Sequence, residues 1–325
     1  MAAQTKRKCA ICNKVFQVPV GHEHENNCCP YCGFMENTVA DKPSCLPPGF
    51  VLHGKYVVGM VIGNGDDSIV YRGWDNRAER VVVVKEFFPM QYAHREHDFS
   101  VSSVGGDRDA RFESGRKRFS DEIKKLERFR NIENTVGLYD QFVENKTQYV
   151  ITEYMDGMNL QQLLRKNGRP FLWKQIAPVI KNVGMTIMGI HDAGLVHKDI
   201  CPDNIIISNK LAVRIAGCDK AGRINELFSD GDLLCRPGFS APELYHPSGR
   251  AGTFTDVYSL AATIYYLLTG KIIPEPSVRL QVREYAKLTS FGFGKGFSTS
   301  IDQALVIDQR ERTESIRALL QDLNL

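Results

Sequence analysis

The stretch that decides the fold is His197-Lys-Asp199-Ile-Cys-Pro-Asp-Asn204, in which a carboxylate and a carboxamide stand five residues apart. Two shorter motifs follow it along the chain, Ala241-Pro-Glu243 and Asp256-Val-Tyr-Ser-Leu260. Two others precede it: Gly63-x-Gly65-x-x-Ser68, and Lys85 at the end of a run of valines. A glycine pair alone is a weak signal, but five motifs in this order indicate one kind of domain.

Hydrophobic periodicity separates an early part of the chain with strand patterns from a later part with helical patterns. Alternating or β-branched segments predict strands at 56–62, 81–84 and 149–152. Apolar residues at helical spacing predict helices at 113–130, 173–193, 255–269 and 311–320. Strands first and helices later predict an α+β fold with a small sheet lobe and a larger helical lobe.

Lys85 directly follows the apolar strand pattern at 81–84, where an ammonium group is costly to bury without a partner. A carboxylate partner is therefore expected, and Glu122 on the helical segment 118–130 is the candidate. The alternative is that Lys85 stands at a strand edge and extends its ammonium to water.

With these motifs the chain resembles the bacterial eukaryotic-like (Hanks-type) Ser/Thr protein kinases. The resemblance covers 46–325 and implies a bilobal protein-kinase fold, with a β-rich N-lobe at 50–154 and a helical C-lobe at 155–325. The phrases that carry it are LPPGFVLHGKY (46–56), VVVVKEFFP (81–89), HKDICPDNIII (197–207), FSAPELY (239–245) and TDVYSLAATIYYLLTGK (255–271).

The resemblance also implies roles for individual residues. In that family a Gly-rich loop covers the ATP phosphates with backbone N–H groups, and a strand lysine binds the α and β phosphates. The matching positions are Gly63, Gly65 and Ser68 for the loop, Lys85 for the lysine, Glu122 for its partner, Thr152, Glu153 and Met155 for adenine, Asp199 for the catalytic base and Asn204 for a metal ligand. Glu243 and Arg312 match a structural ion pair, and Asp256 matches a buried anchor under the catalytic loop.

The largest departure from the family pattern lies where the metal-binding DFG element belongs, at Gly-Cys-Asp in 217–219. Gly217 is eighteen residues after Asp199, the usual separation in the family, and the alternation in 213–215 supports that register. Glycine has no carboxylate, and one carboxylate–cation contact is worth about 4 kcal/mol at an effective dielectric near 20, or about three decades of equilibrium. Asp219 is an alternative ligand if the strand or turn slips by two residues.

Other departures also fall on nucleotide contacts. Asp66 and Asp67 at the tip of the Gly-rich loop are expected to repel a polyphosphate. Val83 narrows the adenine slot, where the family prefers alanine. Cys201 replaces the catalytic-loop lysine, and Arg236 replaces a threonine expected shortly before Ala241-Pro-Glu243. ATP and Mg²⁺, which the resemblance implies as cofactors, are therefore expected to bind poorly.

Residues 1–45 carry a different signal. The pairs Cys9-x2-Cys12 and Cys29-x2-Cys32, sixteen residues apart, predict a zinc ribbon with one structural S4 site. Metal ligation, worth roughly 10–16 kcal/mol, is enough to order a segment with so few large apolar side chains. The alternatives are a disordered tail or a redox pair, and the competing ligands are Cys28, His22 and His24.

Composition narrows the class of protein further. Of 325 residues 43% are apolar, enough for one large core or two modest ones. The net charge of +3 comes from basic residues interleaved with acids, so no nucleic-acid partner is expected. No leader-like segment and no run of about 18 apolar residues is found, so we expect no membrane partner and a cytoplasmic location. Nine cysteines with paired spacing favour a reducing compartment.

The departures predict a pseudokinase, a regulatory or binding module with impaired Mg-ATP binding. The alternatives are an active Ser/Thr kinase that uses Asn204 and Asp219 for magnesium, or a nucleotidyl transferase on the same scaffold. In each case the zinc ribbon or the kinase-like domain is expected to dock a protein partner.

Overall fold

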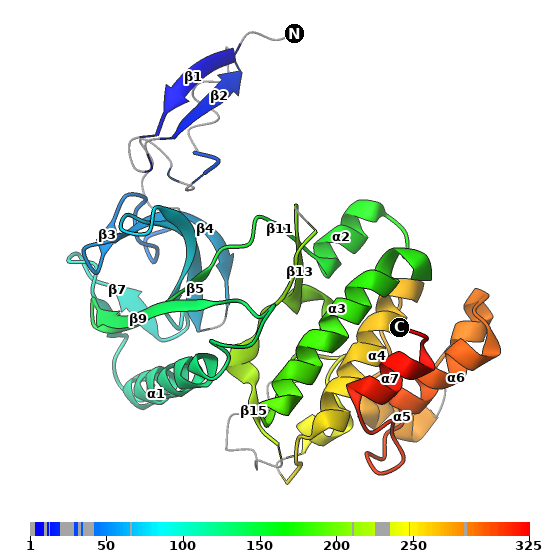
Figure 1. Cartoon of the computed structure of the whole chain (residues 1–325). Helices are drawn as coiled ribbons and strands as arrows, with labels where there is room; N and C mark the ends of the chain where they lie inside the picture. The colour runs from blue at the N-terminus through cyan, green and yellow to red at the C-terminus, as the bar shows by residue number, and fades with distance from the viewer. Residues whose placement is uncertain are drawn as a thin grey trace. The chain divides into compact units, whose positions relative to one another are not determined.

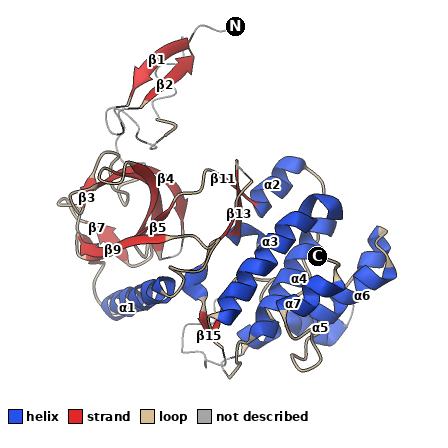
Figure 2. Ribbon diagram, in the orientation of Figure 1, coloured by secondary structure: helices blue, strands red, loops and turns tan. Residues whose placement is uncertain are grey.

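The structure is a computed structural model, and the residues that it describes are 4–9, 12, 14–19, 29–31, 34, 42–65, 67–209, 211–224, 235–246, 248–282 and 285–325. The chain divides into two compact units. The first consists of Met1–Lys124 and Gly137–Tyr154, and the second of Lys125–Val136 and Met155–Leu325. Strands dominate the first unit and helices the second (Figure 2), so the α+β organisation expected from the sequence is confirmed.

The first unit is built on a six-stranded antiparallel sheet in the order β3-β4-β5-β6-β10-β9. Figure 1 labels β3, β4, β5 and β9 of this sheet. The three strands predicted from β-branched runs all belong to it. Its members are β3 (Val51–Leu52), β4 (Tyr56–Asn64), β5 (Ser68–Asp75), β6 (Arg80–Phe87), β9 (Leu138–Glu144) and β10 (Thr147–Glu153). Two hairpins complete the described strands of this unit: β1 (Gln4–Lys8) with β2 (Val15–Pro19), and β7 (Ala93–Arg95) with β8 (Val101–Ser103).

Helix α1 (Arg108–Glu127) packs on this sheet through aromatic side chains. The ring centroids of Phe112 and Phe119 each lie 5.5 Å from that of Phe87, the last residue of β6. The helix begins before the predicted 113, because the turn at Gly105 and Gly106, both at positive φ, already ends the preceding hairpin. It ends at Glu127, three residues before the predicted 130, and its buried residues are Phe112, Gly115, Phe119 and Ile123.

A fully buried carboxylate, Glu86 on β6, ties the sheet to the β7–β8 hairpin. Arg95 binds it through two nitrogens, at 3.1 Å from Oε1 and 2.7 Å from Oε2. The hydroxyls of Tyr149 and Tyr71 donate to the same two oxygens at 2.7 and 2.9 Å. Arg95 also donates to the main-chain oxygen of Ser44 at 2.8 Å, so the network reaches the segment that follows the cysteine pairs.

The second unit is mainly helical. Its helices are α2 (Leu160–Asn167), α3 (Trp173–Asp192), α4 (Thr253–Thr269), α5 (Pro276–Val282), α6 (Lys295–Ala304) and α7 (Ile316–Asp322). Its short strands are β11 (Gly157–Asn159), β12 (Leu195–Val196), β13 (Ile205–Ser208), β14 (Val213–Ile215) and β15 (Gly222–Arg223). Its 3-10 turns are η1 (Pro202–Asn204), η2 (Cys218–Lys220), η3 (Pro242–Tyr245) and η4 (Leu288–Phe291).

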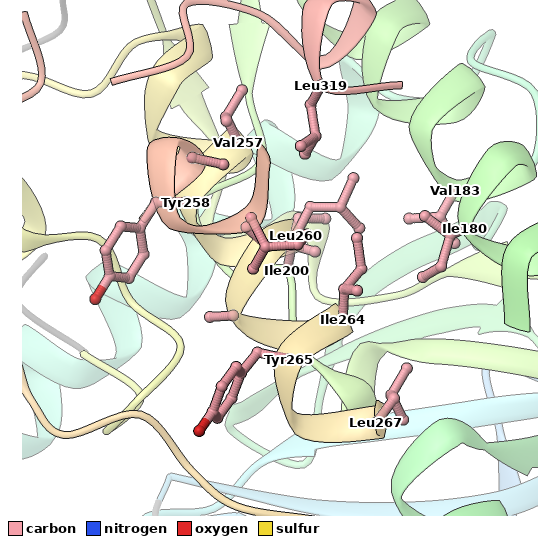
Figure 3. Close-up of a cluster of buried hydrophobic side chains, with 14 of the residues drawn as sticks. Ile180, Val183, Ile200, Val257, Tyr258, Leu260, Ile264, Tyr265, Leu267 and Leu319 are labelled. Atoms are coloured by element: carbon pink, nitrogen blue, oxygen red, sulfur yellow. The ribbon is translucent and has the colours of Figure 1, made fainter. Parts of the chain in front are cut away.

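The core of this unit lies around α4, whose sequence is apolar on nearly all sides. Figure 3 shows Leu260 and Ile264 of α4 directed toward Ile180 and Val183 of α3 and Leu319 of α7. All five side chains are fully buried. A helix that is hydrophobic all round belongs in the interior of a large domain, so α4 forms the centre of the scaffold. Among the described residues, no helix has the length and apolarity that a bilayer crossing requires.

The helix predicted at 311–320 is shorter than expected. Helix α7 begins only at Ile316, where the Ser315 hydroxyl caps it by accepting a backbone N–H at 3.2 Å. Arg312 is held outside the helix by a bidentate, buried ion pair with Glu243, at 2.8 and 3.0 Å. The Glu243–Arg312 pair expected from the resemblance is thus confirmed, and it explains the late start of α7.

Candidate functional site

The predicted phosphate loop lies in the first unit, between β4 and β5. Gly63 and Gly65 are exposed, and Gly65 N–H donates to the carbonyl of Ser68 at 2.8 Å, which closes the turn. A Cβ on Gly65 would lie 3.1 Å from the Ser68 hydroxyl, so the tight turn favours glycine there. The loop therefore exposes main chain, as a phosphate-covering loop requires. Asp66 lies outside the described residues.

The surroundings of Asp67 differ from those predicted from the sequence. Its carboxylate is ion-paired with Arg118 of α1 and accepts the Tyr92 hydroxyl at 3.3 Å. Burial and the Asp67 charge raise the pKa of Tyr92, so this phenol stays a donor. The prediction that Asp67 faces and repels a polyphosphate is thereby weakened, because its charge is compensated within the first unit.

Lys85 lies on β6, opposite Val70 of β5 and Val150 of β10. Its ammonium is 5.4 Å from the centroid of the Phe119 ring on α1. Glu122 follows Phe119 by three residues, one helical turn, and therefore lies on the same face of α1. The arrangement is compatible with the predicted Lys85–Glu122 pair, which stays a prediction.

The predicted adenine contacts lie where β10 ends. Thr152 is directly opposite Val83 of β6, the residue predicted to narrow the adenine slot. The two residues are therefore neighbours on adjacent strands. Glu153 N–H donates to the carbonyl of Gly137 at 2.8 Å, which fixes the strand end. Met155 is the first residue of the second unit after this strand.

In the second unit, Asp256 fixes the main chain at the start of the motif 197–204. This fully buried carboxylate accepts the backbone N–H groups of His197 at 2.8 Å and Lys198 at 2.9 Å, and contacts His191 Nε2 at 2.8 Å. Burial acts to raise the pKa of Asp256, but the contacts with His191 and His197 outweigh it and hold the pKa below its ordinary value. Lys198 adopts a φ of 69°, a conformation that L residues rarely take, and the Asp256 bonds maintain it.

Asp199, the predicted base, has both carboxylate oxygens bound by Arg236. Arg236 Nε donates to Oδ1 at 2.9 Å and a terminal nitrogen donates to Oδ2 at 3.0 Å, a bidentate pair. Asn204 Nδ2 donates to the same Oδ2 and to the Asp199 carbonyl, each at 2.8 Å. These bonds to Asp199 raise the pKa of Arg236, so its guanidinium stays charged. In this arrangement a substrate hydroxyl has to compete with Arg236 for the Asp199 oxygens.

Gly217 occupies the turn after β14. Within 213–215 the first and last residues are buried and pair with β13 in register, as the alternation predicts. Gly217 has φ 82° and ψ 16°, and a Cβ there would lie 2.9 Å from Asn204 Cγ. The Asn204 side chain thus lies where a carboxylate at 217 would begin. Asp219 lies farther on, within η2.

The cysteines near this turn are packing residues. Cys218 is buried with Phe129, Ile190 and Leu195, and burial raises the pKa of its thiol. Cys201 is also fully buried, and burial together with the Asp199 charge raises the pKa of its thiol to about 12. Both thiols therefore stay neutral at physiological pH and act as small hydrophobic side chains.

Three of the four predicted zinc ligands lie together. The Sγ atoms of Cys9, Cys12 and Cys29 are all within 4.8 Å of one another, and Cys12 Sγ is 3.6 Å from Cys29 Sγ. Zn–S bonds of 2.3 Å in a tetrahedron place sulfurs about 3.8 Å apart, so the spacing fits zinc. Cys32 lies outside the described residues, as do Cys28, His22 and His24.

The two cysteine knuckles also share a backbone pattern. Cys9 N–H donates to the carbonyl of Lys14 at 3.0 Å, and Cys29 N–H donates to that of Phe34 at 2.7 Å, five residues on in both cases. The equivalence of the two turns supports Cys32 as the counterpart of Cys12. With Cys32 as the fourth ligand, zinc would cross-link the two knuckles as a structural ion and would have no open coordination position.

The sequence interpretation missed the role of Arg236. Two departures from the family pattern indicate it. Position 201 has cysteine in place of the family's lysine, and position 236 has arginine in place of its threonine. Read together, they indicate that the positive charge beside Asp199 comes from a different segment of the chain, and the observed ion pair has this arrangement.

Comparison with known proteins shows the family of this domain. A family model described as "Protein kinase domain" matches residues 56–290. The serine/threonine-protein kinase PknL of Mycobacterium tuberculosis is 31% identical over 222 residues, 68% of this chain and 50% of PknL. PrkC of Bacillus subtilis is 26% identical over 223 residues, 68% of this chain and 31% of PrkC. The chain therefore spans half or less of these relatives' lengths.

A solved structure titled "PpkA-294 apo form" is also similar. It superimposes with a TM-score of 0.74 at 27% sequence identity, covering 86% of this chain and 99% of that one. The match extends over nearly the whole of that chain, so the fold assignment covers both units.

Proposed function

Because this chain belongs to the protein kinase family, as a member of the Hanks type, we propose that its kinase domain is a pseudokinase: a regulatory or binding module with impaired Mg-ATP binding. The observation that carries the proposal is Gly217 in the turn after β14, where the family has its metal-binding aspartate. The strand register supports this alignment, because the alternation in 213–215 agrees with the eighteen-residue separation from Asp199.

The state of Asp199 supports the same proposal. Its bidentate pair with Arg236 satisfies both oxygens, and Asn204 donates its amide to one of them. A general base must be within hydrogen-bond reach of the proton that it takes. Here the base accepts hydrogen bonds from Arg236 and from Asn204, the second metal ligand, so it is engaged by the chain itself and not poised for a substrate.

An active Ser/Thr kinase is the second candidate. It is supported by the retained Lys85, Asp199 and Asn204, and by the names of the relatives, which are Ser/Thr kinases. In this case Asp219 must reach the metal ion from η2, which requires the turn at Gly217 to rearrange.

Thermal unfolding with ATP, in the presence and absence of Mg²⁺, separates the candidates. A ligand at a hundredfold excess over its Kd stabilises a protein by about 2.7 kcal/mol, or several degrees in Tm for a domain of this size. We expect the Tm with ATP to be the same with and without Mg²⁺. A Mg²⁺-dependent rise of several degrees would refute the pseudokinase.

Labelled ATP distinguishes phosphate transfer from nucleotidyl transfer. Transfer of the γ label to protein, abolished in Asp199→Ala, would establish the active kinase. Transfer of the α label would instead establish the nucleotidyl transferase. We expect neither label to be transferred, because the site lacks the carboxylate that holds the metal.

For the N-terminal segment, the proposal is a structural zinc ribbon with Cys9, Cys12, Cys29 and Cys32 as ligands. The spacing of the three described thiols and the matched knuckle turns support it. A module of this kind, beside a kinase domain with an impaired site, suits docking of a protein partner.

A further inference from the structure

One arginine of the sheet contacts both the second cysteine knuckle and the end of strand β10. A terminal nitrogen of Arg72, on β5, donates to the carbonyls of Pro30 at 2.5 Å and Tyr31 at 2.8 Å. Both carbonyls lie between Cys29 and Cys32 in the sequence. The same guanidinium lies 4.6 Å from the ring centroid of Tyr154, the residue that follows β10.

The contact belongs to a larger shared cluster. Cys9, Cys12, Phe16 and Cys29 are buried in one cluster with Val57 of β4 and Trp74 of β5. The Lys14 ammonium is 5.2 Å from the centroid of the Tyr31 ring and 5.7 Å from that of Trp74. The cysteine knuckles and the sheet are therefore parts of one packed structure within the first unit.

The position of the two carbonyls depends on the metal. Pro30 and Tyr31 are in the turn that zinc closes through the thiolates on either side, and this segment has little apolar content to hold it otherwise. When the turn opens, Arg72 loses two acceptors together and its stacked position on Tyr154 loses support. Glu153, the preceding residue, ends the strand, where it lies opposite Val82 of β6 and donates its N–H to the carbonyl of Gly137 at 2.8 Å.

We propose that Arg72 couples the metal state of the zinc ribbon to the order of the β10 end at Glu153 and Tyr154. The ribbon then acts on the kinase domain from within the same chain, besides any docking role. This inference rests on the proposed zinc ribbon but not on the pseudokinase proposal, because its readouts are structural and need no nucleotide.

Tryptophan fluorescence tests the shared cluster. The chain has two tryptophans, and Trp173→Phe leaves Trp74 as the only reporter. Removal of zinc by a chelator should shift the Trp74 emission to longer wavelength, and added Zn²⁺ alone should restore it. An unchanged emission would overturn the inference, because the ribbon would then be folded independently of the sheet.

Hydrogen exchange at the amides of 152–154 tests the role of Arg72. Zinc removal should raise their exchange roughly tenfold in the unaltered chain, since one stabilising contact set is lost. In Arg72→Met these amides should exchange rapidly with or without zinc, so the ratio should approach one.

A matched control is available on the same sheet. Arg80 also stacks on a tyrosine, with its guanidinium 3.4 Å from the Tyr139 ring centroid, and no contact with the cysteine knuckles is described for it. Arg80→Met should keep the tenfold zinc response. The inference is overturned if Arg72→Met keeps that response, or if the unaltered chain shows none.

Discussion

Gly217→Asp is expected to give the protein Mg²⁺-dependent ATP binding. The added carboxylate supplies a contact worth about 4 kcal/mol, or about three decades in affinity for the metal-bound nucleotide. Aspartate is one of the few L residues that adopt positive φ readily, so it tolerates the φ of 82° better than most. The measurement is the difference in Tm with ATP between buffers with and without Mg²⁺.

Gly217→Ala is the matched control, because it brings the same Cβ without the carboxylate. That Cβ approaches Asn204 Cγ to 2.9 Å, so the Asn204 amide must shift in both variants. Left-handed backbone costs an L residue about 1–2 kcal/mol, so both variants should lose some stability without ligand. If Gly217→Ala shows the same Mg²⁺ response, or Gly217→Asp shows none, Gly217 is not the position at which metal binding was lost.

Metal binding alone is not expected to restore phosphate transfer. In Gly217→Asp, Asp199 is still held by Arg236 at 2.9 and 3.0 Å, so the guanidinium competes with a substrate hydroxyl for its oxygens. The double variant Gly217→Asp with Arg236→Thr removes that pair and returns the residue expected in the family. We expect γ-label transfer only from the double variant, at a low rate because Cys201 still replaces the catalytic-loop lysine. Transfer by the single variant would show that the Arg236 pair opens readily.

How far the site could be predicted from the sequence differs between its parts. The register of Gly217 followed from two local features, a count from Asp199 and the alternation in 213–215, and the observed burial agrees with both. Short-range patterns of this kind predict the structure well, because side chains alternate between the two faces of a strand with a period of two residues. The expected roles of Asp199 and Asn204 rest on the resemblance and stay predictions.

The partners of charged side chains could not be predicted in the same way. Asp67 pairs with Arg118, fifty-one positions away, and Asp199 pairs with Arg236, thirty-seven positions away. Which long side chains meet depends on how distant segments pack, and no local period encodes it. Arg72 is a further example, because its acceptors are backbone carbonyls, which any sequence supplies.

The burial of Glu86 could also have been predicted from the sequence, from the alternation of side chains along β6. Lys85 stands out as a charge beside the valine run, yet within 81–86 of β6 the buried positions are those of Val82, Val84 and Glu86, followed by the buried Phe87 at the strand end. Strict alternation therefore assigned the buried face to the glutamate and the half-buried face to the lysine. A carboxylate on the buried face requires several donors, and Arg95, Tyr71 and Tyr149 supply them.

Arg95→Met is consequently expected to be among the most destabilising single changes in the first unit. Among the described residues, it leaves the fully buried Glu86 carboxylate with the hydroxyls of Tyr71 and Tyr149 as its remaining side-chain donors. Burial and the Glu86 charge raise the pKa of both phenols, so they remain neutral donors and cannot replace the cation. Breaking one side of a buried ion pair costs about 3–5 kcal/mol, which urea unfolding measures as a lower midpoint with an unchanged slope.

Arg310→Met provides the control, because the two arginine pairs have nearly the same geometry and differ in exposure. Arg310 binds Asp308 at 3.1 and 2.7 Å, as Arg95 binds Glu86, but its side chain is 83% exposed whereas that of Arg95 is 3% exposed. Water already solvates the exposed pair, so Arg310→Met should leave the urea midpoint unchanged. Pairing Arg95→Met with Glu86→Gln removes the stranded charge and should recover part of the loss. If Arg95→Met lowers the midpoint no more than Arg310→Met, water reaches Glu86 and the network does not hold the β7–β8 hairpin to the sheet.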